Sequence, residues 1–335
     1  MGNRATPPRS FNTVKQSNRE QRRKRHETGR MVLLSIFLVG IAILLSLFVF
    51  IICSIVDALD GNVPEQPDDT EETSGDAGTA GGVLYDGATT KANSDIHTGE
   101  LVIVNKDNYF DPSKAANLKN IYDNRLKYNG INNTYQIGES TWKLNSDALN
   151  AFNQMMYKYY ELEGDGSVKI SSAYRSYEDQ ANSATSSTLP GYSDHHTGYC
   201  LALRTTAGGY LESDHWIYQN AHKYGYIVRY PADKTAWTGV SGYEYCIRYV
   251  GVAHATYIKE NGLCLEEYVD MLKNDYTSEH LKINGADGNE YEVYYVPVSS
   301  GDLTTVKIPS NYQYTVSGDN IGGFIVTVNL TAPNA

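Results

Sequence analysis

The pattern of apolar and polar positions divides the chain into stretches of different character. An uncharged run of 26 residues extends from Met31 to Val56. It is long enough to cross a bilayer, because about 20 residues suffice at a rise of about 1.5 Å per residue. Between residues 101 and 272, apolar residues recur at the spacings of short helices and strands. Beyond Asp275, four β-type runs are separated by turn-forming residues, as in a small all-β unit.

Local signals within residues 101–272 predict individual elements. Residues 101–104 (LVIV) predict a short strand, and Ser146 is expected to cap a helix that ends at Gly164. The apolar stripe of that helix consists of Leu149, Phe152, Met156 and Tyr159. Strands are predicted at 168–174, 226–231 and 245–251, and helices at 215–225 and 253–260. Because these elements mix without a regular βαβ repeat, the predicted fold class is α+β.

The charges change abruptly at the borders of the uncharged run. Residues 1–30 hold nine Lys/Arg and two Asp/Glu, whereas residues 57–335 hold 19 Lys/Arg and 37 Asp/Glu. A cleavable signal peptide has a short basic start and an apolar core of roughly 7 to 15 residues, so residues 31–56 predict an uncleaved transmembrane signal anchor. Positive charge stays on the cytoplasmic side. Residues 1–30 are therefore predicted to be a basic cytoplasmic tail, and everything after Val56 to be extracytoplasmic.

The exported part has three predicted regions. Residues 57–100 carry eleven Asp/Glu, one Lys and few large apolar residues, which predicts a disordered acidic linker. Residues 101–274 are long enough for one domain with a core of its own. Residues 275–335 predict a small β-strand appendage that packs on that domain. The acidity of the exported part argues against nucleic acid as a partner, because phosphate binding requires a basic surface.

Three polar clusters carry the candidate chemistry: SSAYRSYEDQ at 171–180, LPGYSDHHTGYCLAL at 189–203, and YIVRYPADKTAWTGVSGYEYCIRYVG at 226–251. In this order they resemble the VanY-type D-alanyl-D-alanine carboxypeptidases, zinc enzymes that remove the terminal D-Ala of peptidoglycan stem peptides. The resemblance covers residues 101–272, about half of the chain. It implies a domain of that fold with a small antiparallel sheet, and a peptidoglycan stem peptide as the partner.

The resemblance also implies where a zinc ion would be held, and this chain departs from that pattern. His195 matches the first ligand of the family, in the stretch from Ser193 to Gly198. The family's Asp ligand is replaced by Ala202, its second His by Cys246, and its general-base Glu by Tyr243. A catalytic zinc needs about three protein ligands and a base, which His195 alone does not provide. An impaired site is therefore expected, and bound zinc is doubtful.

Two cysteines leave alternatives open. Cys200 lies two residues before Ala202, so on a strand both side chains point to one face. Cys200, Cys246 and His195 would then form a Cys₂His zinc site, with Glu244 in place of the missing base, although Glu244 would point away from the face of Tyr243. Alternatively, Cys200 and Cys246 form a disulfide outside the cell, or remain free buried thiols.

The substrate side of the pattern is better preserved. The resemblance implies that Arg175 holds a substrate carboxylate, that Ser193 orients the peptide, and that Gln180 keeps its place in the substrate site. The sequence thus predicts a membrane-anchored, extracytoplasmic VanY-type domain that binds stem peptides rather than cutting them. The alternative is an active zinc D,D-carboxypeptidase with a rearranged His/Cys/Cys site.

Overall fold

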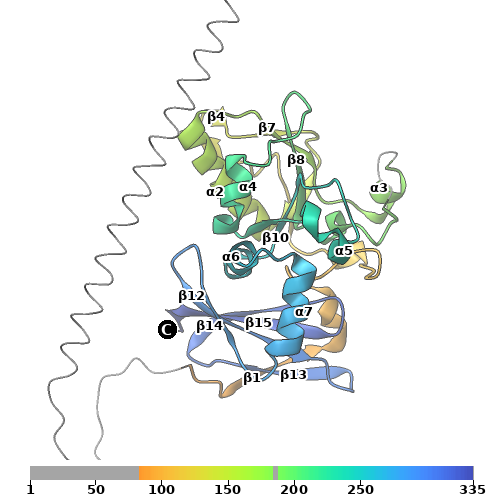
Figure 1. Ribbon diagram of the computed structural model, residues 1–335, viewed down its shortest axis with the longest axis vertical. Coiled ribbons are helices and arrows are strands. Elements are labelled where there is room, and N and C mark those ends of the chain that lie inside the picture. Colours follow the sequence, from red (N-terminus) through yellow and green to blue (C-terminus); the bar gives the residue numbers. More distant parts are fainter. Residues whose placement is uncertain (1–82, 184–187, 335) are drawn as a thin grey trace, which may run out of the picture. The chain divides into compact units, whose positions relative to one another are not determined.

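The computed structural model describes residues 83–183 and 188–334, which form a mixed α/β fold with small sheets (Figure 1). The predicted cytoplasmic tail, the predicted transmembrane segment at 31–56 and the first part of the predicted linker lie outside the described residues. Within the described part of the chain, no helix combines the length and the apolar character needed to span a bilayer.

A five-stranded sheet forms the upper part of the fold in Figure 1. Its strands occur in the order β5 (Gln136–Ile137), β7 (Val168–Ser172), β8 (Cys200–Thr205), β10 (Cys246–Tyr249) and β9 (Tyr226–Val228). β5 pairs with β7 in parallel, and the other neighbours are antiparallel. The long helix α2 (Ser146–Glu163) and the short helix α4 (Trp216–Asn220) lie beside this sheet and share its main hydrophobic core.

Helix α2 follows directly from its sequence. The side chain of Asn145, rather than the predicted Ser146, caps its first turn by accepting hydrogen bonds from two backbone N–H groups. Gly164 ends it in the left-handed conformation, at φ 64°, which glycine adopts without strain. All four residues of the predicted stripe are buried, so this prediction is confirmed.

The predicted helix at 215–225 consists of α4 and the 3-10 helix η4 (Ala221–Tyr224), and it stops at Gly225 as expected. The predicted helix at 253–260 is α6 (Val252–Glu260). The remaining elements of this part are η2 (Pro112–Lys114), β2 (Leu118–Asn120), β3 (Lys127–Tyr128), β4 (Asn132–Asn133), β6 (Lys143–Asn145), α3 (Tyr177–Ala181), η3 (Asp194–Thr197), η5 (Ala232–Lys234) and α5 (Thr235–Thr238).

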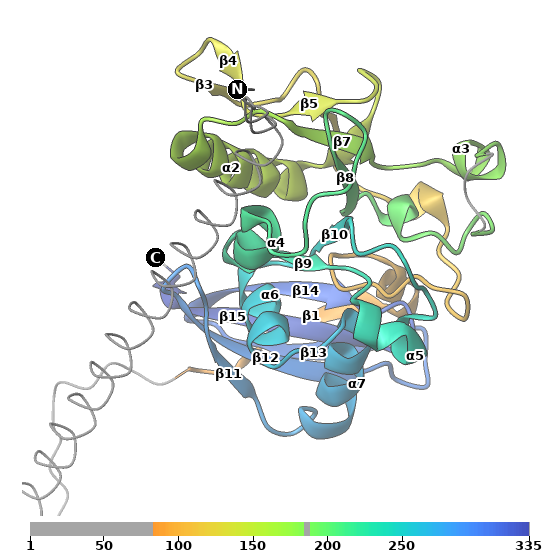
Figure 2. The same ribbon diagram turned by 45° about the horizontal axis from the view of Figure 1, so that its top comes forward.

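A second, four-stranded antiparallel sheet is formed by the C-terminal residues. Its order is β11 (Leu281–Asn284), β12 (Glu290–Pro297), β15 (Gly323–Pro333) and β14 (Tyr312–Gly318). Helices α6 and α7 (Leu265–Asp275) lie against it (Figure 2). Tyr268 of α7, Tyr295 of β12 and Ile325 of β15 belong to one buried cluster. The C-terminal strands therefore share a core with the preceding helices instead of forming a separate body.

The predicted linker ends earlier than the sequence analysis placed it. β1 (Gly87–Ala92) pairs with β13 (Leu303–Ile308) along its whole length, and η1 (Asn93–His97) follows. The Tyr85 hydroxyl also donates to Glu292 at 2.5 Å. Residues 83–100 are ordered because their backbone completes the C-terminal β unit, which the acidic composition of residues 57–100 taken as a whole does not reveal.

The predicted strand at 101–104 is also wrong. All four residues are buried, but their side chains enter two different hydrophobic clusters. Their backbone is bonded to side chains and to a loop instead of a neighbouring strand: the N–H of Ile103 donates to the carbonyl of Asp319. Arg248 donates to the carbonyls of Glu100 and Val102. The segment is an extended connection held by arginines.

His254 of α6 joins three elements within the lower core. Its Nδ1 lies 2.7 Å from the Tyr268 hydroxyl, and its Nε2 lies 2.9 Å from the Thr327 hydroxyl of β15. The His254 side chain is buried, and this burial lowers its pKa to about 3. The neutral imidazole, with one donor and one acceptor, therefore matches its two hydroxyl partners.

We expect His254 to make stability depend on pH. In the unfolded chain a histidine takes up a proton near pH 6.5, whereas the folded protein does so only near pH 3. The unfolded state binds more protons in this window, so the free energy of unfolding should fall by about 1.4 kcal/mol for each pH unit below about 6.5. Urea unfolding of His254→Gln at pH 7, 6 and 5 should show a shallower decline than the parent protein. Equal slopes would contradict the assignment.

Candidate functional site

A cleft of about 930 Å³ opens above β8 and β10. It is bordered by the end of β7 and by the loops before η3 and β10. Its lining consists of Asn105, Lys106, Ser171, Ser172, Arg175, Thr188, Leu189, Tyr192, Ser193, His195, Ala202, Arg204, Tyr230, Gly239, Val240, Ser241, Tyr243, Tyr245 and Cys246. No Asp or Glu is among these described residues, whereas three Lys or Arg are.

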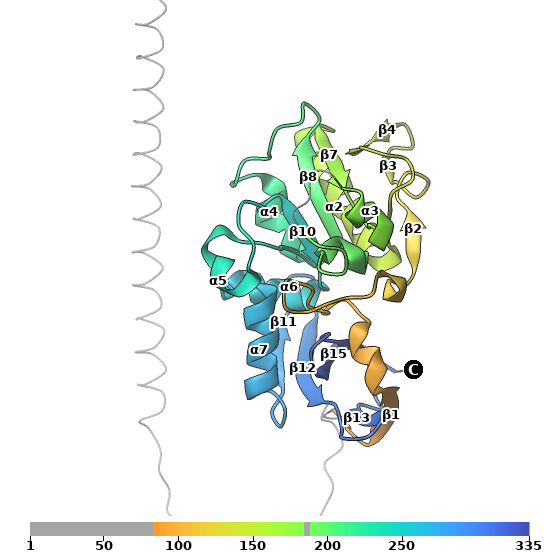
Figure 3. The ribbon, with the colours of Figure 1, turned by 90° about the vertical axis from the view of Figure 1, so that its right-hand side faces the viewer.

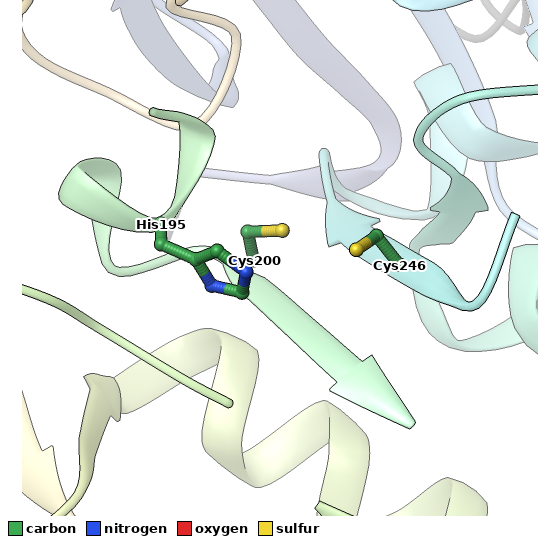
Figure 4. A group of neighbouring side chains, drawn as sticks. All are labelled: His195, Cys200 and Cys246. Carbon is green, nitrogen blue, oxygen red and sulfur yellow. The ribbon is translucent and has the colours of Figure 1, made fainter. Parts of the chain in front are cut away.

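Three potential metal ligands converge at the floor of this cleft. His195 comes from η3, Cys200 from the start of β8 and Cys246 from the start of β10, and the three side chains point toward one another (Figure 4). Their ligand atoms all lie within 4.8 Å of one another. Both cysteines are buried, and Tyr230 and Tyr243 pack against them.

The loop that carries His195 is shaped by its neighbours in the sequence. Gly198 ends η3 at φ 76°, a conformation that favours glycine, and the chain then enters β8. His196, although adjacent to His195, is turned away from the cleft. Its Nε2 accepts a hydrogen bond from the N–H of Gly191, and its Nδ1 donates to the carbonyl of Arg175 at 2.7 Å. Of the two histidines, only His195 faces the cleft.

Asp194 fixes the same loop from below. One of its carboxylate oxygens lies 2.5 Å from Nη1 of Arg248 and 3.3 Å from Nε of Arg229, and all three side chains are fully buried. Arg229 in turn makes two hydrogen bonds to Glu266 of α7, at 2.7 and 2.9 Å. Burial alone would raise the pKa of Asp194, but the two guanidinium groups outweigh it and hold this pKa below its usual range. The carboxylate is therefore charged and paired.

Arg175 is held in place at the end of the cleft next to His195. Its Nε donates to the Ser172 hydroxyl at 3.0 Å, and its Nη1 donates to the side-chain carbonyl of Gln180 at 3.1 Å. Ser193 and Arg175 both line the cleft, as the sequence predicted for substrate contacts. Gln180 does not line it. It is buried, and its side-chain carbonyl orients Arg175, while its predicted contact with a substrate stays a prediction.

Comparison with known proteins identifies the family. A family model described as VanY, D-alanyl-D-alanine carboxypeptidase, matches residues 141–252. A D-alanyl-D-alanine carboxypeptidase of Enterococcus faecium is 33% identical over 246 residues, which cover 71% of this chain and 78% of that protein. The chain belongs to the VanY D-alanyl-D-alanine carboxypeptidase family.

One solved structure shares the fold of this chain over most of its length. The crystal structure of the vancomycin resistance D,D-dipeptidase VanXYg, in complex with a D-Ala-D-Ala phosphinate analog, is similar with a TM-score of 0.62 and 27% identity. The match covers 72% of this chain and 98% of that one, so it extends well beyond residues 141–252. A D,D-pentapeptidase VanY structure that contains Zn(II) is 25% identical over 51% of this chain and 98% of that one, with a TM-score of 0.40.

The VanY pattern clarifies which replacements matter here. Ala202 and Tyr243, which the resemblance places at the family's Asp ligand and general-base positions, both line the cleft. Glu244 does not line it, although the sequence analysis named it as a substitute base. It is exposed and borders a separate pocket of about 610 Å³ with Tyr218. Glu244 lies in the turn before β10 and does not face the cleft, so this arrangement gives no support to Glu244 as a substitute base.

The structure also decides between the thiol alternatives. All three described cysteines, Cys200, Cys246 and Cys264, are free. In the ladder between β8 and β10, Cys246 lies opposite Ala202, and Cys200 lies opposite Arg248. The two cysteines are thus diagonal neighbours, which are typically about 7–8 Å apart, whereas disulfides usually join Cα atoms within about 6.8 Å. The predicted disulfide alternative is not formed.

The residues present fit a zinc ion. The Nδ1 atom of His195 is buried without a hydrogen-bond partner among the described residues. With Zn–N and Zn–S bonds of about 2.1 and 2.3 Å, ligand atoms on one ion are separated by about 3.5–4 Å, so the 4.8 Å cluster needs only small side-chain adjustments. The pKa of the Cys200 thiol is raised mainly by a hydrogen bond with Cys246, and burial raises it further. A bound cation would instead favour the thiolate form of Cys200, because a coordinating thiol is deprotonated.

Sequence reasoning missed two groups of residues. The buried Asp194, Arg229 and Arg248 were hidden because such residues usually lie on the surface. Arg204, which lines the cleft, follows Ala202 by two residues on β8 and therefore shares its face. The alternation that identified Cys200 would have identified Arg204 as well.

We expect Asp194→Asn to destabilise the protein by about 3 kcal/mol or more. The substitution leaves two buried guanidinium groups with one carboxylate, and an uncompensated buried charge is costly. Chemical unfolding followed by circular dichroism measures the change. Asp302→Asn removes the same charge from an exposed position and should change the unfolding free energy by less than about 0.5 kcal/mol. Similar effects of the two substitutions would show that the buried network is not important for stability.

Proposed function

We propose that this chain binds peptidoglycan stem peptides that end in D-Ala-D-Ala, and that it cleaves them poorly or not at all. The supporting observation is the composition of the cleft. Arg175 and Ser193 line it at the positions where the family contacts its substrate, whereas no carboxylate lines it among the described residues. Recognition of the peptide carboxylate is thus retained without the group that would activate water.

The missing carboxylate bears directly on the reaction. Hydrolysis by a metallopeptidase requires a base that takes a proton from the attacking water. Tyr243 offers a phenol hydroxyl at the base position, which acts as a hydrogen-bond donor at neutral pH and does not replace a carboxylate. His196 is not available either, because both of its ring nitrogens are hydrogen-bonded to backbone groups.

The convergence of His195, Cys200 and Cys246 supports one alternative function, that of an active zinc D,D-carboxypeptidase with a rearranged site. His195, Cys200 and Cys246 would hold the metal. A zinc ion bound there would supply Lewis-acid polarisation of a peptide carbonyl. The chain's own residues would orient the peptide through Arg175, and the Tyr230 and Tyr243 side chains would cover the cysteines. Zinc occupancy alone is compatible with both functions, so turnover distinguishes them.

Binding without turnover is the expected result with a synthetic pentapeptide ending in D-Ala-D-Ala. Isothermal titration calorimetry on the zinc-loaded protein should detect the peptide, while a D-Ala release assay on the same sample should remain at background. Arg175→Lys keeps the charge but loses the planar fork that matches a carboxylate, and should weaken binding about tenfold. Steady D-Ala release that a chelator abolishes would instead establish the active zinc enzyme. Absence of binding would refute both.

We also propose that residues 31–56 anchor the protein in the cell membrane, with residues 1–30 in the cytoplasm and the cleft outside. The uncharged run and the excess of Lys and Arg before it support this orientation. Alkaline carbonate extraction should leave the full chain in the membrane pellet, and deletion of residues 31–56 should shift it to the soluble fraction. Release of the full chain by carbonate would contradict the anchor.

A further inference from the structure

Arg204 is held rigidly at the wall of the cleft. Its guanidinium carbon lies 3.7 Å from the ring centroid of Tyr210 and 4.3 Å from that of Tyr245. The two rings, with centroids 5.1 Å apart, lie next to each other, and the guanidinium group packs against both. Stacking of this kind orients an arginine without neutralising its charge, because the aromatic rings carry no net charge.

Among the described residues, the lining of the cleft offers Arg204 no carboxylate partner. No ion pair of Arg204 occurs there, and the cleft lining contains no Asp or Glu. In the ladder between β7 and β8, Lys169 lies directly opposite Arg204, and no ion pair of Lys169 occurs in that part of the chain either. Like charges directly opposite each other disfavour strand pairing. A bound anion would relieve this repulsion, which makes the pair a suitable anion site.

The position of this pair along the cleft indicates what it would contact. Ala202 lies opposite Ser172 on one side and Cys246 on the other, while Arg204 lies one pleat further along, opposite Lys169. Arg175 binds Ser172 from beyond the other end of β7. Arg175 and Arg204 therefore stand at opposite ends of the cleft, with the metal-ligand cluster between them. Along β8, Arg204 lies about 7 Å beyond Ala202, on the side of the metal-ligand cluster away from Arg175.

We propose that Arg204, together with Lys169, is a second anion subsite that selects peptides with a free carboxylate on the residue preceding D-Ala-D-Ala. This inference rests on the proposed function, in which Arg175 binds the terminal carboxylate. The ligand class is then a peptide with two carboxylates, one at its end and one on the side chain two residues earlier. The Tyr210 and Tyr245 rings keep Arg204 pre-oriented, so little side-chain entropy is lost on binding.

The test compares two peptides that differ by one charge, N-acetyl-Glu-D-Ala-D-Ala and N-acetyl-Gln-D-Ala-D-Ala. Calorimetric titration of the full chain in detergent should show about tenfold tighter binding of the Glu peptide, the size expected for one charge-assisted hydrogen bond. In Arg204→Gln the preference should fall to about twofold or less. Lys169→Gln leaves the contacts of Arg204 with Tyr210 and Tyr245 intact and should lower the preference by an intermediate factor. Lys307→Gln removes the same charge from exposed β13 and should keep the full preference.

The outcomes separate this inference from the function on which it rests. If the parent protein binds both peptides equally, the second subsite is refuted, while the proposed peptide binding stands. If it binds neither peptide, the proposed function is refuted, and this inference with it. If Arg204→Gln does not fold, as judged by circular dichroism, Lys169→Gln decides alone, and an unchanged preference in that variant overturns the proposal.

Discussion

Asp194 lies fully buried between Arg229 and Arg248, and the geometry of the cleft depends on this contact. The carboxylate occupies the position just before His195, so the two guanidinium groups hold the loop that presents this ligand. Glu266 of α7 balances the second positive charge through Arg229. Two buried cations and two buried anions leave no net charge, which is the condition under which such a group is tolerated in a protein interior.

The same arginines connect the cleft to the C-terminal sheet. Arg248 lies on β10 and shares a face with Cys246, and its guanidinium group also binds the carbonyls of Glu100 and Val102. Arg229 follows β9 and contacts α7, whose other side packs on β12. Seen from the side, the two sheets lie one above the other with α6 between them (Figure 3). The C-terminal strands therefore support the cleft from below, although none of their residues lines it.

Sequence patterns predicted the parts of this fold in which local signals and packing agree. Helix α2 has its stripe, its glycine stop and a polar cap, and the C-terminal strands have alternating apolar residues between turns. The segment at 101–104 was mistaken for a strand because a segment that is buried on both sides consists of consecutive apolar residues. This run is the same whether the backbone pairs with another strand or is hydrogen-bonded by arginines, as it is here. β1 was missed because its partner, β13, lies more than 200 residues away along the chain. Of the site, His195 and Cys246 were anticipated from the resemblance to the VanY pattern and Cys200 from strand alternation, whereas the buried charge network had no sequence signal.

Under the proposed function, the replacements at positions 202 and 243 would alter binding and catalysis in opposite directions. Relative to the family pattern, Ala202 and Tyr243 remove two carboxylates from a cleft that keeps Arg175 and Arg204. The proposed anionic peptide would then meet a more positive site, which would stabilise its bound ground state. The transition state loses its base, and any metal held by Cys200 and Cys246 would carry two thiolates, which donate more negative charge to it than a His/Asp set does. Because rate acceleration requires that the transition state be bound more tightly than the substrate, under the proposed function this combination would favour retention of the peptide over its hydrolysis.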